Sequence, residues 1–163
     1  MSSVSLGKQL GQLFQQQIKA AEALYQLLKD ENEALIQRNY ERTTQLTQLK
    51  QSKSTEIDAL SNQLSKLFSA ESSSLNQDTL DKFIKEFPAQ LGNSLKQMRA
   101  KLEEITLACQ DQNTINGQII AVNKQSAETA LAILRGQFST NELTYGAGGQ
   151  PIKDQSASPI TKA

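Results

Sequence analysis

The sequence has 163 residues, and its 17 basic and 17 acidic side chains cancel to a formal net charge of zero. Because the charges balance and no basic patch is present, electrostatics give no support for binding to nucleic acid or to an acidic membrane surface. Only 37% of the residues are hydrophobic and 5% are aromatic, which is lean for a globular core and suits helices that bury one apolar stripe.

The first predicted element is one long helix over residues 5–69. This stretch contains no proline, and its only glycines are Gly7 and Gly11. Apolar residues recur in steps of three and four, which predicts a coiled-coil-like seam. At a rise of 1.5 Å per residue such a helix would span about 90 Å, so we expect a partner helix to lie along it. The seam includes Leu6, Leu10, Leu13, Leu24, Leu28, Leu35, Leu46, Leu49, Ile57, Leu60, Leu64 and Leu67.

A serine-rich break over residues 69–76 follows, and residues 77–86 are predicted to form a short helix. Pro88 suits the first turn of a second long helix that reaches Arg135. The connection is short, so we expect the second long helix to return antiparallel to the first. The sequence therefore predicts an all-α protein, an elongated antiparallel helical hairpin with a short connecting helix and a disordered C-terminal tail.

The stretch from Ile105 to Gly136 has the densest apolar pattern of the chain. Its narrow seam is polar at several positions, which is unusual for a coiled-coil seam. Further apolar residues flank the seam at spacings of seven, so the apolar arc is wider than a two-stranded seam needs. Either a third helix or a partner protein covers this arc. The flanking residues are Ile120, Ala127 and Leu134 on one side, and Ile115 and Val122 on the other.

Beyond Gly136 the composition changes. Three glycines fall within four residues at Gly146, Gly148 and Gly149, and large apolar side chains are few. We predict a helical domain over residues 1–136 and a flexible tail over residues 137–163. Tyr145 in this tail is either an incidental aromatic residue or the anchor of a short docking motif.

Residues with catalytic or metal-binding chemistry are scarce. The chain has no histidine and one cysteine, Cys109, which we interpret as a small core residue. The tail glycines do not follow the pattern of a phosphate-binding loop. No stretch approaches the roughly 20 apolar residues of a membrane span, and the first ten residues do not resemble a signal peptide. We therefore expect no enzyme activity, no cofactor, no metal and no stable membrane insertion, and a cytoplasmic location.

Two motifs are more specific than the helical periodicity. The first is the Asn-x-x-Asn-Gly step at Asn113, Asn116 and Gly117, which the Ile119–Ile120 pair follows. The second is Leu-x-Tyr-Gly-x-x-Gly in the tail, which contains Tyr145, Gly146 and Gly149. With these motifs, the chain closely resembles the FlgN family of flagellar type III export chaperones. It departs from the family pattern at Thr144, where members often have leucine, and in having no tryptophan.

The resemblance implies a cytoplasmic chaperone that binds the hook–filament junction proteins and acts transiently at the flagellar export apparatus. It implies that Tyr145 docks to the cytoplasmic domain of the export gate. Two alternatives stay open, a structural coiled-coil or scaffold protein and a type III chaperone for another cargo such as the filament subunit. The candidate cargo-binding residues are Ile115, Ile120, Val122, Ala127, Leu131 and Leu134.

Overall fold

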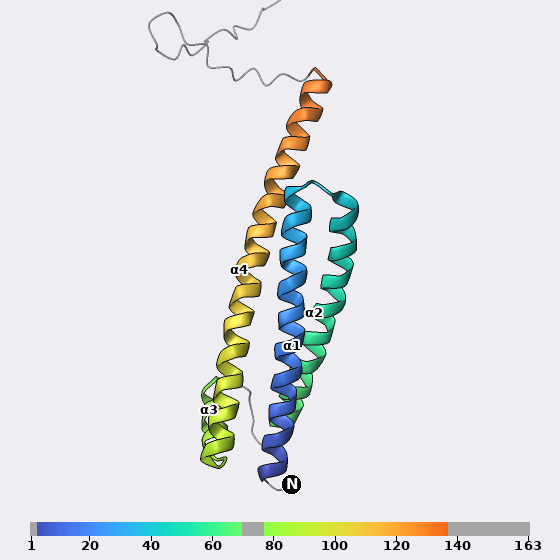
Figure 1. Cartoon of the computed structure of the whole chain (residues 1–163). Coiled ribbons are helices and arrows are strands. Elements are labelled where there is room, and N and C mark those ends of the chain that lie inside the picture. The colour runs from blue at the N-terminus through green and yellow to red at the C-terminus, as the bar shows by residue number, and fades with distance from the viewer. Residues whose placement is uncertain (1–2, 70–76, 137–163) are drawn as a thin grey trace, which may run out of the picture. The chain divides into compact units, whose positions relative to one another are not determined.

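The computed structural model describes residues 3–69 and 77–136, which contain the helices α1 (Ser3–Ile36), α2 (Tyr40–Ser69), α3 (Gln77–Lys85) and α4 (Ala89–Leu134) (Figure 1). Within these ranges there is no strand, so the predicted all-α class is confirmed. The chain forms two compact units, residues 1–123 and 124–163. The predicted flexible tail, residues 137–163, lies outside the described residues.

The prediction of one helix over residues 5–69 is wrong, because the chain turns between α1 and α2. Arg38 lies in the left-handed region with φ 54°. This conformation lets the Asn39 N–H donate to the carbonyl of Ala34 at 2.9 Å, five residues back. Such a pattern is a Schellman motif, which normally has glycine at the left-handed position. Here the motif ends α1 with an arginine at that position.

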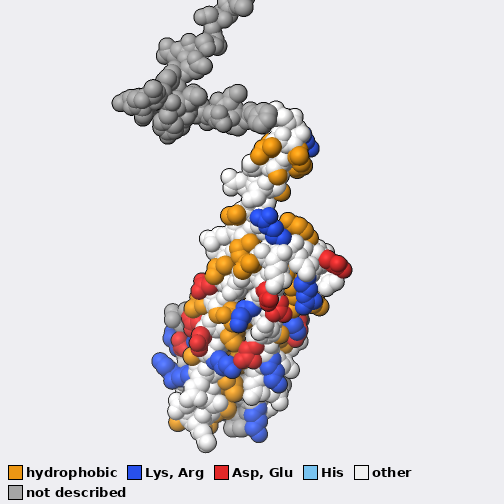
Figure 2. All heavy atoms as spheres, turned by 45° about the horizontal axis from the view of Figure 1, so that its top comes forward, with side chains coloured by type: hydrophobic (Ala, Val, Ile, Leu, Met, Phe, Trp, Pro, Cys, Tyr) orange, Lys and Arg blue, Asp and Glu red, His pale blue; other side chains and the backbone are white. Residues whose placement is uncertain are grey.

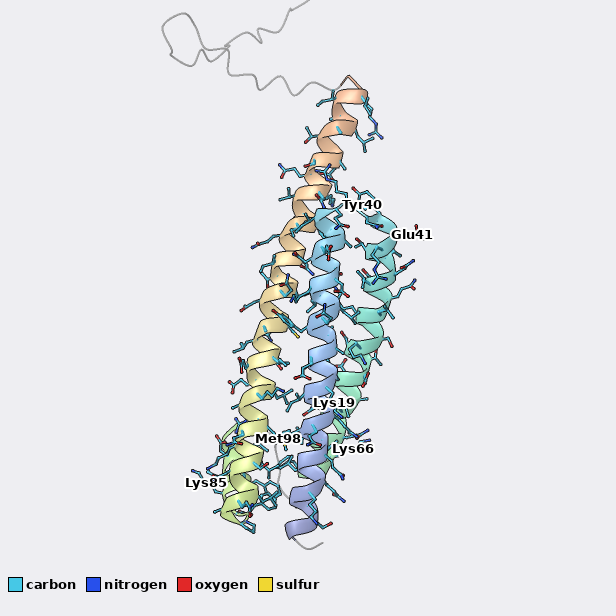
Figure 3. All side chains as sticks on the ribbon, viewed as in Figure 1. Lys19, Tyr40, Glu41, Lys66, Lys85 and Met98 are labelled. Atoms are coloured by element: carbon cyan, nitrogen blue, oxygen red, sulfur yellow. The ribbon has the colours of Figure 1, made fainter. Side chains whose placement is uncertain are left out.

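The same turn starts α2. Asn39 caps the new helix, because its side-chain Oδ1 accepts a hydrogen bond from the Arg42 N–H at 3.0 Å. Glu41 in the first turn places a negative charge at the positive end of the helix. Figure 3 shows Tyr40 and Glu41 at this point, where α2 begins beside the end of α1. Thus α1 and α2 form an antiparallel hairpin with a three-residue turn.

The direction of α4 also differs from the prediction. The Cys109 thiol donates to the carbonyl of Ala21 at 3.5 Å, and the Asn123 amide donates to the carbonyl of Leu35 at 3.3 Å. Because both residue numbers increase together, α4 runs parallel to α1. Of the two helices of the hairpin, α2 is therefore the one to which α4 is antiparallel (Figure 1). The turn at residues 37–39 is the reason, since it reverses the chain once more than the sequence analysis expected.

The predicted short helix and second long helix are confirmed as α3 and α4, with ends within two residues of those expected. Helix α3 and the first turns of α4 pack on the first turns of α1 and the last turns of α2. Phe83 lies between two other rings, with centroid distances of 4.9 Å to Phe68 and 5.0 Å to Phe87 in edge-on geometry. Gly92 allows α3 to approach α4, because a Cβ there would lie 3.0 Å from the Ile84 carbonyl oxygen. The buried cluster consists of Leu10, Phe14, Leu64, Phe68, Leu80, Ile84, Phe87 and Leu95.

Candidate functional site

Asn116 is a polar residue in the seam of α4 that faces α1, and it is 1% exposed. Both atoms of its side-chain amide group have hydrogen-bond partners. Its amide nitrogen donates to the Leu28 carbonyl and to Glu31 Oε2, both at 2.8 Å. Its oxygen accepts from the Asn32 amide at 3.0 Å and from the Gln112 amide at 3.1 Å. A buried amide satisfied on both atoms is stable only in this register. The structure thus supports a register role for Asn116 in the Asn-x-x-Asn-Gly step.

Helix α2 joins the same network through an ion pair. The Lys50 Nζ lies 2.8 Å from Glu31 Oε1 and 3.0 Å from Oε2. The Glu31 side chain is 3% exposed, whereas that of Lys50 is 25% exposed. A buried carboxylate needs such partners, because burial without them costs several kcal/mol. The network therefore connects three helices through one carboxylate.

Three of the predicted cargo-binding residues lie on α4 in the first unit. Ile115 and Ile120 are each 47% exposed, and Val122 is 61% exposed. They lie on both sides of the seam, at the same level as the buried Asn116. Since the seam itself is closed against α1, these apolar side chains remain on the surface. This placement is what a surface for a protein partner requires.

The other three predicted residues lie in the second unit, on the last turns of α4. Ala127, Leu131 and Leu134 are all exposed, and Leu134 reaches 83%. Figure 2 shows hydrophobic side chains among sparse charges on this part of α4. The predicted position of Gly136 after the helix end is confirmed, because this residue has φ 68°.

The remaining motif residues lie in different surroundings. Asn113 lies at the edge of a groove. Gly117 is exposed, and a methyl carbon added at its Cα would meet no side chain or neighbouring helix of the described residues within 4 Å. Gly117 therefore allows close approach but has no close neighbour among the described helices. Tyr145, Gly146 and Gly149 lie outside the described residues.

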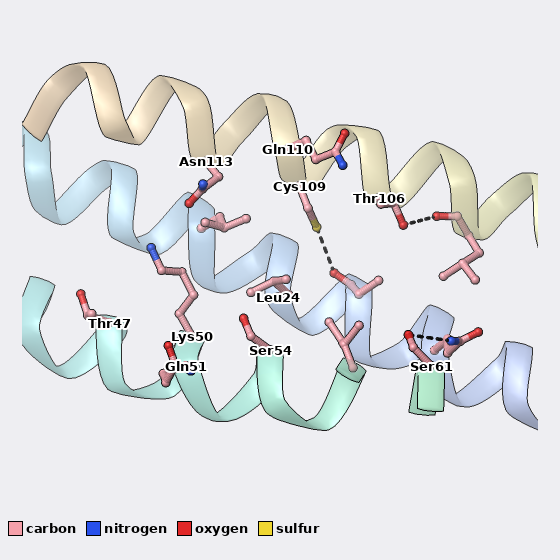
Figure 4. A pocket seen from close by; sticks show the side chains of 15 residues that line it. Leu24, Thr47, Lys50, Gln51, Ser54, Ser61, Thr106, Cys109, Gln110 and Asn113 are labelled. Atoms are coloured by element: carbon pink, nitrogen blue, oxygen red, sulfur yellow. Dashed lines mark hydrogen bonds between the residues drawn. The ribbon is translucent and has the colours of Figure 1, made fainter. Parts of the chain in front are cut away.

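A groove in the first unit was missed by the sequence analysis. Its floor is α1 and its walls are α2 and α4, and it encloses about 490 Å³ (Figure 4). Small side chains create it, among them Ala21, Ser54 and Thr106, where larger ones would fill the space between three helices. No periodicity in one helix reveals such a groove, because it depends on how three helices come together.

The groove contains the single thiol of the chain. Cys109 is 8% exposed, and burial raises the pKa of its thiol. A raised pKa leaves little thiolate at neutral pH, so this cysteine is a small core residue rather than a nucleophile. Across residues 3–69 and 77–136, no group of three or more Cys, Asp or Glu side chains could hold a metal ion. In the same ranges no helix has the length and apolarity of a membrane span.

The described residues form a helical fold with large exposed apolar side chains on one long helix, which is typical of helical proteins that offer a surface to protein partners. The family model described as FlgN protein matches residues 1–152. The chain therefore belongs to the FlgN family, which is a family of flagellar export chaperones, and the predicted resemblance is confirmed. Comparison with the curated proteins and with the solved structures gave no match.

Proposed function

We propose that this protein is a cytoplasmic export chaperone for the hook–filament junction proteins and carries them to the flagellar type III export gate. The observation that carries the proposal is the exposure of Ile115, Ile120 and Val122 beside a seam that is already closed. An amphipathic cargo helix would cover these side chains and remove them from water. The exposed Leu131 and Leu134 of the second unit offer apolar area of their own for a protein partner.

Docking to the export gate is assigned to a separate element, the tail. Family resemblance supports Tyr145 as the aromatic anchor, with Gly146 and Gly149 leaving the backbone beside it free of side chains. A desolvated aromatic anchor contributes about 2 kcal/mol or more to binding. In this proposal the chaperone holds its cargo through α4 and reaches the gate through Tyr145, transiently and without a cofactor.

One experiment tests both surfaces, with two variants that are expected to fail in opposite assays. Ile120→Asp should lose binding of a purified junction protein by several kcal/mol, because the charge would be buried unpaired against the cargo. Tyr145→Ala should keep cargo binding and weaken binding to the cytoplasmic domain of the gate by about thirtyfold. Isothermal calorimetry measures each affinity, and circular dichroism checks that the helices are intact.

Gln118→Asp is the matched control, because Gln118 is an exposed polar residue on the same helix. Its cargo affinity should equal that of the wild type. If Ile120→Asp binds cargo normally, the cargo surface is not on this part of α4. If Tyr145→Ala binds the gate normally, the tail tyrosine is incidental and the gate recognises another element.

A further inference from the structure

The buried Asn116 is followed directly by Gly117, and packing gives no reason for a glycine at this position. A methyl group added at the Cα of Gly117 would meet no side chain or neighbouring helix of the described residues within 4 Å. Glycine also weakens the interior of a helix relative to alanine. The consequence of the glycine therefore lies in the chemistry of the Asn–Gly pair rather than in a contact.

An asparagine that precedes glycine is especially prone to deamidation, because glycine has no side chain that hinders the reaction. The backbone nitrogen of the glycine attacks the side-chain carbon Cγ of the asparagine, and the new N–Cγ bond closes a succinimide ring. The Cγ–Nδ2 bond breaks, and ammonia leaves with the proton of the backbone N–H. Water then opens the ring. The product is aspartate, or isoaspartate, in which the main chain runs through the former side chain.

The folded structure opposes this reaction at both reacting groups. Gly117 lies inside α4, and in an α-helix each backbone N–H donates to the carbonyl four residues earlier. The attacking nitrogen is therefore held in helical geometry. The leaving group, Asn116 Nδ2, donates to the Leu28 carbonyl and to Glu31 Oε2, both at 2.8 Å. The amide cannot turn toward the Gly117 nitrogen without losing these two hydrogen bonds to α1.

The product of the reaction does not fit the site that the amide occupies. An aspartate oxygen in place of Asn116 Nδ2 would face two acceptors, the Leu28 carbonyl and Glu31 Oε2, at the distance of a hydrogen bond. The Glu31 side chain is 3% exposed, and its cation is Lys50. A second carboxylate would have to share this cation, and two like charges in a buried site repel strongly. Isoaspartate would also lengthen the main chain and interrupt α4.

We propose that Asn116–Gly117 is a site of spontaneous deamidation, which the packing of α4 on α1 suppresses and which reacts when α4 leaves that position. The modified chain cannot rebuild the hydrogen bonds around Glu31, so the reaction is one-way. It converts time spent in the open state into a permanent loss of the closed seam. The reaction needs water alone, and the argument uses contacts within the first unit, so the inference does not rest on the proposed function.

The test compares rates at three asparagines of one peptide. The full chain is incubated in mildly alkaline buffer, with and without urea, and is then digested with trypsin. The fragment 102–124 contains Asn113, Asn116 and Asn123, and tandem mass spectrometry measures the deamidation of each. In urea, Asn116 should react many times faster than the other two, which precede larger residues. Without urea the rate at Asn116 should fall by at least about tenfold, because the reaction then waits for local opening.

Four variants separate the chemistry from the stability of the fold. Gly117→Ala should fold and should remove most of the reaction at Asn116 in urea. Asn116→Asp imitates the product and should lower the urea midpoint of unfolding. The exposed Asn113→Asp, one turn earlier on α4, is its control and should leave the midpoint unchanged. Adding Glu31→Gln to Asn116→Asp should recover much of the loss, or restore folding if the single variant does not fold, because one carboxylate is removed.

A second measurement uses the unsubstituted chain. Anion-exchange chromatography separates the chains that have gained a negative charge in urea, and these should refold with a lower urea midpoint than the unmodified ones. A rate at Asn116 that is equal with and without urea would overturn the proposal. So would a rate in urea no higher than at Asn113 and Asn123, or a deamidated chain as stable as the unmodified one.

Discussion

The two ends of the first unit are held together by different interactions. Near the start of α1, eight buried apolar side chains from four helices and the turn before α4 form one cluster, which includes Phe14 and Ile84. Near the end of α1, hydrogen bonds and an ion pair around Glu31 and Asn116 lie beside the buried Leu28, Leu35 and Leu46. Apolar burial supplies most of the free energy of folding, whereas a buried polar network contributes less and depends strictly on geometry.

This difference indicates that the two regions have different roles in the fold. The apolar cluster stabilises the unit, and the polar network selects the register in which α4 lies on α1. The groove lies between these two regions, with Gln17 toward the cluster and Lys50 in the network. The groove therefore has a stable base at one end and a fixed helix alignment at the other.

The strongest test of the comparison removes an aromatic ring from the cluster. Phe14 is 1% exposed, so Phe14→Ala should lower the free energy of unfolding by about 3–5 kcal/mol through lost burial and a remaining cavity. Urea unfolding followed by circular dichroism measures this loss. Leu107→Ala is the control at a 54% exposed position and should change stability by about 0.5 kcal/mol or less. Similar losses in both variants would contradict the assigned role of the cluster.

A smaller effect is expected in the polar network. Glu31→Leu removes one acceptor from Asn116 and the partner of Lys50, and should cost about 2–3 kcal/mol, moderated by the partial exposure of Lys50. Adding Lys50→Met should restore much of the loss, because no unpaired charge then remains. Thermal and urea unfolding of both variants provide the measurement.

Glu33→Leu serves as the control for that pair of variants, because Glu33 is exposed and its hydrogen bond to Gln37 lies on the surface. Its free energy of unfolding should stay within about 0.5 kcal/mol of the wild type. A double variant no more stable than Glu31→Leu alone would show that the cost comes from Asn116 rather than from the ion pair.

The smallest effect is expected at the turn between α1 and α2, and it has the opposite sign. Arg38 holds φ 54°, which glycine adopts without strain, so Arg38→Gly should raise the free energy of unfolding by up to about 1 kcal/mol. Differential scanning calorimetry measures the change. Gln48→Gly, at an exposed position in the interior of α2, should instead lose about 0.5–1 kcal/mol. If both glycine variants are destabilised, strain at Arg38 is negligible.

The helix boundaries show what sequence patterns reveal about this fold. The limits of α3 and α4 were predictable, because serines, Pro88 and Gly136 are strong local signals. The turn at residues 37–39 was missed because it contains neither glycine nor proline, and because Leu35 and Leu46 on either side stay in register with each other through polar positions. Asn39 as a capping residue was the available signal. Missing this turn also reversed the predicted direction of α4 relative to α1.

At the candidate site, too, the sequence revealed local features but not contacts between distant segments. The flanking positions Ile115, Ile120 and Val122 were found from their spacing relative to the seam, and their exposure agrees with that placement. The polar seam was recognised as unusual, but its partner Glu31 lies 85 residues away from Asn116, and no local pattern joins them. The groove depends on small residues of three helices, so only their packing reveals it.

The parallel pairing of α1 with α4 also sets an order of events during synthesis. Helices α1 and α2 are joined by a three-residue turn, whereas the residues of α1 that contact α4 are separated from it by 88 positions in the sequence. Chains emerge from the ribosome N-terminus first, and short loops close at lower entropic cost than long ones. The α1–α2 hairpin can therefore form while the side of α1 that later contacts Cys109 and Asn116 is still exposed to solvent. For that interval the nascent chain presents an unfinished surface, which is closed only when the middle of α4 has been translated.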